Sequence, residues 1–96
     1  MNTCDLPVGT PEWWNARYAA GDTPWDTGIV PPEVVALVAG GTLRPGWALD
    51  LGCGSGVTGR YLAQHGFSVV GIDLALAALV RARRSAVAAG LAAHFC

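Results

Sequence analysis

Lysine is absent from this chain of 96 residues, and arginine alone supplies its 6 basic side chains. With 7 acidic residues the formal net charge is −1, which excludes a strongly basic protein that binds a nucleic-acid backbone or an anionic membrane surface. Arg81, Arg83 and Arg84 lie close together late in the chain. Because a short basic cluster on a helix is usually a solvated face, we expect no nucleic-acid partner from it.

Cysteine is also scarce, and no long uninterrupted hydrophobic run is present. Cys4, Cys53 and Cys96 are widely spaced, which supports neither a disulfide framework nor a zinc site. The longest apolar candidate, residues 72–80, contains Asp73 and is shorter than the about 20 residues that span a bilayer. Residues 1–10 show neither the basic start nor the apolar stretch of a secretory signal. The sequence therefore predicts a cytoplasmic protein with no metal site and no membrane contact.

What the chain does contain is a hydrophobic fraction of 52% and 13 glycines, which indicates folded structure. Residues 1–45 are predicted to form a helical segment. Residues 10–12, Thr-Pro-Glu, combine a hydroxyl N-cap, a proline in the first turn and an acid near the positive helix end. They predict a helix from Pro11 to about Ala20, closed by Gly21, and the Pro-Pro-Glu of residues 31–33 begins a second helix that reaches Gly40.

Residues 46–96 have the alternating pattern of a parallel α/β sheet. Strands are predicted at 47–51 and 67–72, with a helix at 57–65 between them. A second helix ends at Gly90, and its small apolar face consists of Ala75, Ala78, Leu79, Ala82, Ala86 and Ala89. Residues 91–96 begin a third strand. We expect the first half of a Rossmann-like parallel sheet, truncated after the third strand.

The segment 48–56, Ala-Leu-Asp-Leu-Gly-Cys-Gly-Ser-Gly, follows directly from the first strand into a glycine-rich turn. A right-handed β-α-β crossover brings this turn and the end of the second strand to one crevice, where ligands bind in such folds. Asp73, at the end of the second strand, is placed to accept hydrogen bonds from the two hydroxyls of a ribose.

Two registers of the glycines lead to different cofactors. Gly54, Gly56 and Gly59 match the dinucleotide fingerprint, which keeps an NAD-type domain open as an alternative. In the other register Asp50 stands just ahead of the glycines, and a carboxylate there would repel a pyrophosphate. S-adenosylmethionine carries an ammonium and a sulfonium and no phosphate, so the second register favours it.

Residues 49–56, Leu-Asp-Leu-Gly-Cys-Gly-Ser-Gly, and 69–73, Val-Val-Gly-Ile-Asp, resemble the first two motifs of the class I S-adenosylmethionine-dependent methyltransferases. Upstream, Trp14, Arg17, Tyr18 and the loop of residues 23–28, Thr-Pro-Trp-Asp-Thr-Gly, are similar to the N-terminal segment of the thiopurine and the halide or thiol methyltransferases. The resemblance covers residues 13–90. Members of this family continue for further β-α units, so the chain resembles their N-terminal, cofactor-binding part.

The resemblance implies a set of cofactor-binding residues but identifies no catalytic residue. Within the glycine turn, Gly52, Cys53 and Gly54 would line the methionine part, and Asp50 would support its amino group. Asp73 would hold the ribose, Leu74 would border the adenine and Trp25 would cover the cofactor. The full predicted set is Trp25, Asp50, Gly52, Cys53, Gly54, Gly56, Asp73 and Leu74. The adjacent helix N-terminus could lower the pKa of the Cys53 thiol, yet without a histidine partner we interpret Cys53 as a small lining residue.

The acceptor implied by the resemblance is a small molecule, such as a thiol, a halide or a similar soft nucleophile. An alternative from another class is a truncated, non-catalytic remnant or a fragment that depends on a partner. Truncation would leave the far edge of the first strand unpaired and apolar, which predicts self-association and poor solubility of the isolated chain.

Overall fold

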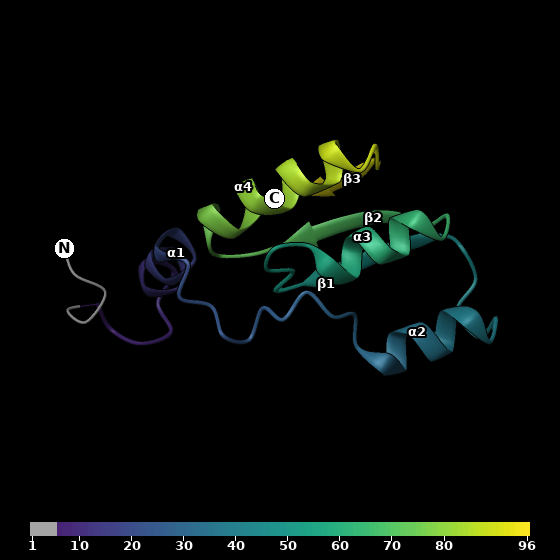
Figure 1. Ribbon diagram of the computed structural model, residues 1–96, viewed down its shortest axis with the longest axis horizontal. Coiled ribbons are helices and arrows are strands. Elements are labelled where there is room, and N and C mark those ends of the chain that lie inside the picture. Colours follow the sequence, from purple (N-terminus) through teal and green to yellow (C-terminus); the bar gives the residue numbers. More distant parts are fainter. Residues whose placement is uncertain (1–5) are drawn as a thin grey trace.

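The computed structural model describes residues 6–96 as a parallel sheet with four helices. The elements, in chain order, are α1 (Pro11–Ala20), α2 (Pro32–Ala39), β1 (Trp47–Leu51), α3 (Val57–Gln64), β2 (Ser68–Ile72), α4 (Leu76–Ala88) and β3 (Ala93–Phe95). Figure 1 shows the strands at the centre, with α3 and α4 beside them and α1 and α2 at opposite ends. The predicted order of helices and strands is confirmed.

The sheet has the strand order β1-β2-β3, and both neighbouring pairs are parallel. In the register Asp50 lies opposite Gly71, and Gly71 lies opposite Phe95. Each pair is joined through a helix, so the sheet consists of two consecutive β-α-β units. This is the Rossmann-like α/β architecture expected from the sequence, and the third strand is shorter than the predicted residues 91–96.

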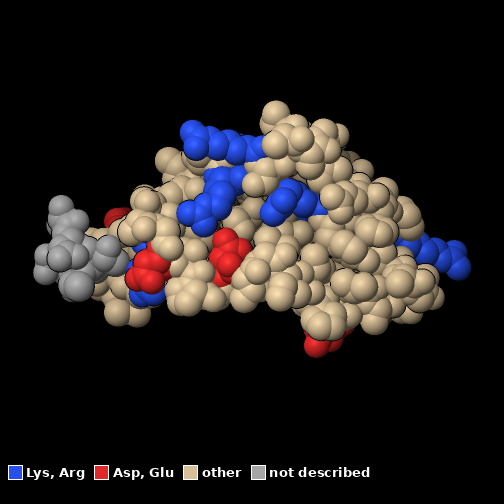
Figure 2. All heavy atoms as spheres, in the orientation of Figure 1, with Lys and Arg blue, Asp and Glu red and all other residues tan. Residues whose placement is uncertain are grey.

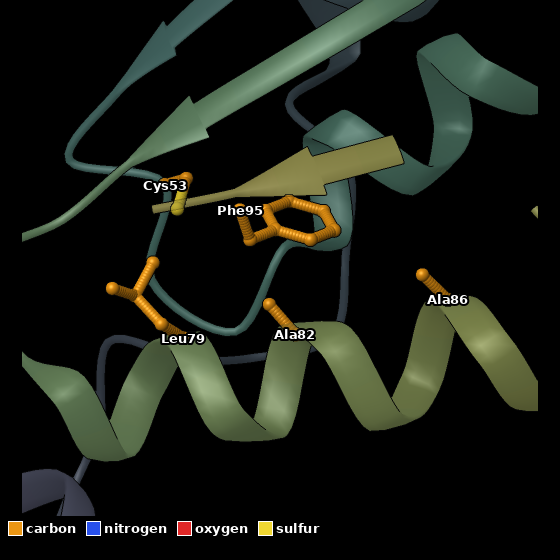
Figure 3. Close-up of a cluster of buried hydrophobic side chains, with 5 residues drawn as sticks. All are labelled: Cys53, Leu79, Ala82, Ala86 and Phe95. Atoms are coloured by element: carbon orange, nitrogen blue, oxygen red, sulfur yellow. The ribbon is translucent and has the colours of Figure 1, made fainter. Parts of the chain in front are cut away.

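One face of the sheet packs on α3 and α4 and forms the core. Val69 on β2 and Phe95 on β3 are 1% and 3% exposed, respectively. Figure 3 shows Phe95 and Cys53 pointing toward three side chains of α4: Leu79, Ala82 and Ala86. Small alanines therefore allow α4 to dock closely, as predicted, although Ala89 is exposed because the helix has already ended at Ala88.

Gly56, the N-cap residue of α3, has a left-handed conformation with φ 81° and packs closely against the Phe95 ring. A Cβ atom at this position would lie 2.9 Å from Cζ of Phe95 and 3.0 Å from Cβ of Ala82. Glycine is therefore required here by the backbone and by the packing together.

The opposite face of the sheet is open to solvent. Trp47, Leu49 and Leu51 alternate along β1, and their side chains are 81%, 61% and 72% exposed. Within the described residues β1 pairs only with β2, so its other edge has no neighbouring strand. Among residues 6–96, no helix is long and apolar enough to cross a membrane.

Helix α1 has the predicted caps and docks against α4. The hydroxyl of Thr10 accepts a hydrogen bond from the Trp13 amide at 3.2 Å, and Gly21 closes the helix with φ 72°. The first turn of α4 has no cap of its own, because Ala75 precedes it. Its Ala77 amide instead donates to Oδ1 of Asn15 on α1 at 2.7 Å. The two helices are thus linked by a side-chain cap across 62 residues of sequence.

Candidate cofactor-binding site

Asp73 ties the glycine-rich turn to the start of α4. Its Oδ2 accepts a hydrogen bond from the Gly54 amide at 2.8 Å, and its Oδ1 accepts one from the Ala75 amide at 2.8 Å. The predicted meeting of the glycine-rich turn and the end of β2 is therefore observed. A carboxylate has about four acceptor positions, so each oxygen of Asp73 can still accept one further hydrogen bond.

Two cavities lie beside the Pro-Trp-Asp loop, residues 22–28, and the carboxylate of Asp73 lines the larger of them. The larger one, about 420 Å³, is mostly apolar and is lined by Trp14, Tyr18, Trp25, Gly52, Ile72, Asp73 and Leu74. The smaller one, about 210 Å³, lies between residues 25–29 and residues 52–55. Tyr18, Trp25 and Gly52 line both cavities, so Trp25 and Tyr18 form a wall between them. A further hollow of about 490 Å³ between α1 and α4 contains neither Asp73 nor the glycine-rich turn.

The wall is built from aromatic side chains of α1 and the loop that follows. Nε1 of Trp25 donates to the Tyr18 hydroxyl at 2.9 Å, and the Trp25 ring meets Trp14 edge-on at 5.4 Å. Burial raises the pKa of the Tyr18 phenol above its ordinary value, although the hydrogen bond from Trp25 opposes this shift. The Tyr18 hydroxyl is therefore protonated at neutral pH.

Trp14 and Tyr18 were not predicted as lining residues. They are four residues apart, so they share one face of α1 and point at the same cavity. That spacing was the available signal. It could not show what the face meets, because the contact depends on how α1 docks against α4.

The carboxyl of Asp50 and the thiol of Cys53 both have raised pKa values. Burial raises the pKa of the Asp50 carboxyl, and the negative charge of Asp73 adds to the shift. A cationic ligand group near Asp50 would relieve both penalties. Burial also raises the pKa of the Cys53 thiol to about 12, which agrees with the interpretation of Cys53 as a small lining residue and not a nucleophile. The negative charges of Asp73 and Asp50 add to the effect of burial, and Cys53 stays a neutral thiol.

Six of the eight predicted site residues line one or both of these cavities. Asp73 and Leu74 line the larger cavity, Cys53 and Gly54 line the smaller one, and Trp25 and Gly52 line both. The other two predicted residues, Asp50 and Gly56, line neither of these two cavities. Gly56 lies under Phe95, and Asp50 lies half-buried on β1 before the glycine-rich turn.

No metal centre is formed within residues 6–96, where no group of three or more His, Cys, Asp and Glu side chains is arranged to hold an ion. Cys53 and Cys96 are free thiols, the first buried and the second exposed. Cys4 lies outside the described residues.

Comparison with known proteins places the fold and the glycine-rich turn in a family. Residues 48–96 match the family model described as a methyltransferase domain. The chain belongs to this methyltransferase family. It is 38% identical over 71 residues to an Arabidopsis thaliana protein named "Probable thiol methyltransferase 2", a match that covers 74% of this chain and 31% of the relative. The chain thus spans about a third of the length of that relative.

Solved structures place this methyltransferase chain in the class I fold. A protein studied for the conversion of a disulfide bond into a thioacetal group during echinomycin biosynthesis superposes with a TM-score of 0.81 at 37% identity. The match covers 90% of this chain and 38% of that one. A methyltransferase from Thiobacillus denitrificans in complex with S-adenosyl-L-homocysteine gives a TM-score of 0.66 at 28% identity, over 96% of this chain and 36% of that one.

The cofactor implied by the family and by such complexes is S-adenosylmethionine, which resolves the choice between the two glycine registers. The residues present fit this group. Asp73 keeps free acceptor positions for a pair of hydroxyls, the cavity around it is apolar, and the carboxyl of Asp50 lies half-buried nearby in sequence. No basic side chain lines either cavity within the described residues, as expected for a cationic ligand without phosphate.

Proposed function

We propose that this chain is the cofactor-binding part of a methyltransferase that uses S-adenosylmethionine. The methyl group would be transferred to a small acceptor with a soft nucleophile, either a thiol compound or a halide ion. The observation that carries the proposal is the carboxylate of Asp73. It is held at 2.8 Å from the Gly54 amide and faces an apolar cavity of about 420 Å³. The comparisons support the family, and the acceptor is our proposal.

The two cavities suggest how the cofactor is divided between them. We assign the ribose to Asp73 and the adenine to the apolar surface of Ile72 and Leu74, both of which are partly exposed in the larger cavity. The amino-acid end is assigned to the smaller cavity beside Cys53 and Gly54, with Asp50 balancing its ammonium. Gly56 would then contribute by shaping the turn, because its side of the turn packs on Phe95.

The chemistry needs alignment more than proton transfer. When bound, S-adenosylmethionine supplies a methyl group whose carbon–sulfur bond breaks as the acceptor's lone pair attacks, and sulfur leaves as a neutral thioether. The residues of this chain would hold the reacting atoms in line and keep water out. Trp14, Tyr18 and Trp25 provide an apolar wall suited to that task.

A sulfur acceptor is favoured by the relatives. The Arabidopsis protein carries a thiol methyltransferase name, and the echinomycin protein is described by a reaction at sulfur. A thiolate is a strong nucleophile near neutral pH, so it needs little help from a general base. This agrees with the absence of a histidine among the residues that line the two described cavities.

Calorimetry with S-adenosyl-L-homocysteine and NAD, followed by transfer of a labelled methyl group to thiol, iodide and hydroxyl acceptors, tests the proposal on this chain. We expect binding of the first ligand, weaker or no binding of NAD, and preferential labelling of the thiol. Tighter NAD binding would overturn the cofactor assignment. Binding without transfer to any acceptor would support the alternative of a non-catalytic fragment.

We also propose that the isolated chain self-associates through the open edge and apolar face of β1. Leu49 and Leu51 are exposed there, and a second copy would remove them from water. Sedimentation velocity over a range of concentrations should show association, and Leu49→Lys should shift the chain to monomer. A monomer at all concentrations for the parent chain would contradict this. A cytoplasmic location, in keeping with the free thiols of Cys53 and Cys96, is a further proposal that cell fractionation would test.

A further inference from the structure

The Pro-Trp-Asp loop is fastened to the rest of the molecule at Asp26. Oδ1 of Asp26 accepts a hydrogen bond from the Ser55 hydroxyl at 2.8 Å, and Oδ2 lies 3.6 Å from Nη1 of Arg81 on α4. Figure 2 shows basic side chains gathered over α4 with an acidic side chain close beside them. The predicted solvated face is therefore partly wrong, because Arg81 is engaged with Asp26 and also donates to the Tyr18 carbonyl at 3.0 Å.

We propose that Asp26 is a positioning residue that holds Trp25 as the wall between the two cavities by bonding the glycine-rich turn and α4 at the same time. Trp25 lies between Pro24, whose ring restricts the backbone before it, and Asp26, whose side chain is bonded to Ser55 and Arg81. The backbone of Trp25 is therefore held from both neighbours. The second anchor is the 2.9 Å hydrogen bond from its own ring to Tyr18, whose hydroxyl lies against Gly54.

The hydrogen bond from Ser55 should contribute more to holding Asp26 in place than the ion pair with Arg81 does. Ser55 is only 7% exposed and the side chain of Asp26 17%, so their bond is shielded from water. The Arg81 side chain is 41% exposed, and its charges are 3.6 Å from the carboxylate, where solvent screens much of the attraction. An asparagine at position 26 keeps an oxygen acceptor for Ser55 and loses the charge, which allows the two contributions to be separated.

The wall is tested first without any ligand, so this result is independent of the proposed cofactor. Acrylamide quenching of tryptophan fluorescence is measured in each variant with and without Trp25→Phe, and the difference isolates Trp25. We expect Asp26→Ala and Ser55→Ala to raise the quenching of Trp25 about twofold, since the loop is released, and Asp26→Asn to stay near the parent value. Equal quenching in Asp26→Ala and the parent, with both folded by circular dichroism, would overturn the proposal.

The consequence for ligand binding rests on the proposed function. Asp26→Ala and Ser55→Ala should each weaken S-adenosyl-L-homocysteine binding about tenfold, the loss expected for one shielded hydrogen bond to a charged group. The double variant should bind no more weakly than Asp26→Ala alone. Asp22→Ala is the matched control. Asp22 belongs to the same loop as Asp26 and forms an ion pair of 3.1 Å with Arg17 on α1, but it lines neither cavity. An equal loss in Asp22→Ala would assign the effect to general loosening of the loop and reject the specific role of Asp26.

Discussion

The loss of folding stability caused by Gly56→Ala can be worked out from the structure. Two contributions add: the left-handed backbone, which costs a residue with a Cβ about 1–2 kcal/mol, and the contact at 2.9 Å with Phe95, an overpacking that typically costs about 1–3 kcal/mol. Gly21→Ala is the matched control. Gly21 has a similar φ of 72°, and a Cβ there would meet nothing within 4 Å.

The difference between the two variants isolates the packing contribution. Both lose the same freedom in the unfolded chain, and both have the same backbone penalty, so these contributions cancel. Gly56→Ala should therefore lower the free energy of unfolding by about 1–3 kcal/mol more than Gly21→Ala does. Urea titration followed by far-ultraviolet circular dichroism measures both variants against the parent.

The Phe95 contact can be examined further with a second change. Phe95→Leu replaces the ring that the new methyl group would contact by a smaller side chain. It should therefore recover part of the stability lost in the Gly56→Ala background. Equal destabilisation by Gly21→Ala and Gly56→Ala, with no coupling to position 95, would refute the close approach of residue 56 to the Phe95 ring.

Three further predictions concern charge and reactivity at the site. Asp73→Asn should weaken S-adenosyl-L-homocysteine binding about 10- to 100-fold in calorimetry, because hydrogen bonds to a charged acceptor are worth about 1.5–3 kcal/mol; unchanged affinity would exclude Asp73 from the site. The raised pKa of Asp50 means that the folded chain holds this proton more tightly than the unfolded chain, so stability falls as pH rises through that pKa. Asp50→Asn should thus be more stable than the parent at neutral pH in thermal unfolding and equal to it below the ordinary value of 3.8, and a variant less stable at neutral pH would contradict this sign. Mass-spectrometric mapping after iodoacetamide treatment at pH 8 should find Cys96 alkylated well before Cys53, whose pKa is about 12; comparable rates would disprove the burial of Cys53.

Local sequence signals were sufficient to predict the order of helices and strands in the fold. Thr10 and Gly21 mark the ends of α1 as predicted, because capping depends on residues within one turn. The meeting of Gly54 with Asp73 was also predictable, since the handedness of a β-α-β unit fixes which loops share an edge. Ala89 was placed on the buried face because its spacing continues the pattern of α4, but the helix ends one residue earlier.

Contacts between distant segments could not be predicted in the same way. The arginine cluster gives no sign that Arg81 reaches back to Tyr18 across 63 residues, or that Nε of Arg83 donates to the Phe95 carbonyl at 2.8 Å. The Cys53 thiol shows a similar limit. Its position near a helix N-terminus is visible in the sequence, whereas its burial is decided by Phe95 and α4, which arrive later in the chain.

The cap that Asn15 provides to α4 has a consequence for the order of assembly. Helix α1 is synthesised before α4, so its docking surface exists only after residues 76–88 have been made. Until then the Trp25 side chain has no fixed place over the crevice. Helix α1 is thus positioned only after a helix that is made later in the chain, and until then Trp25 does not cover the glycine-rich turn.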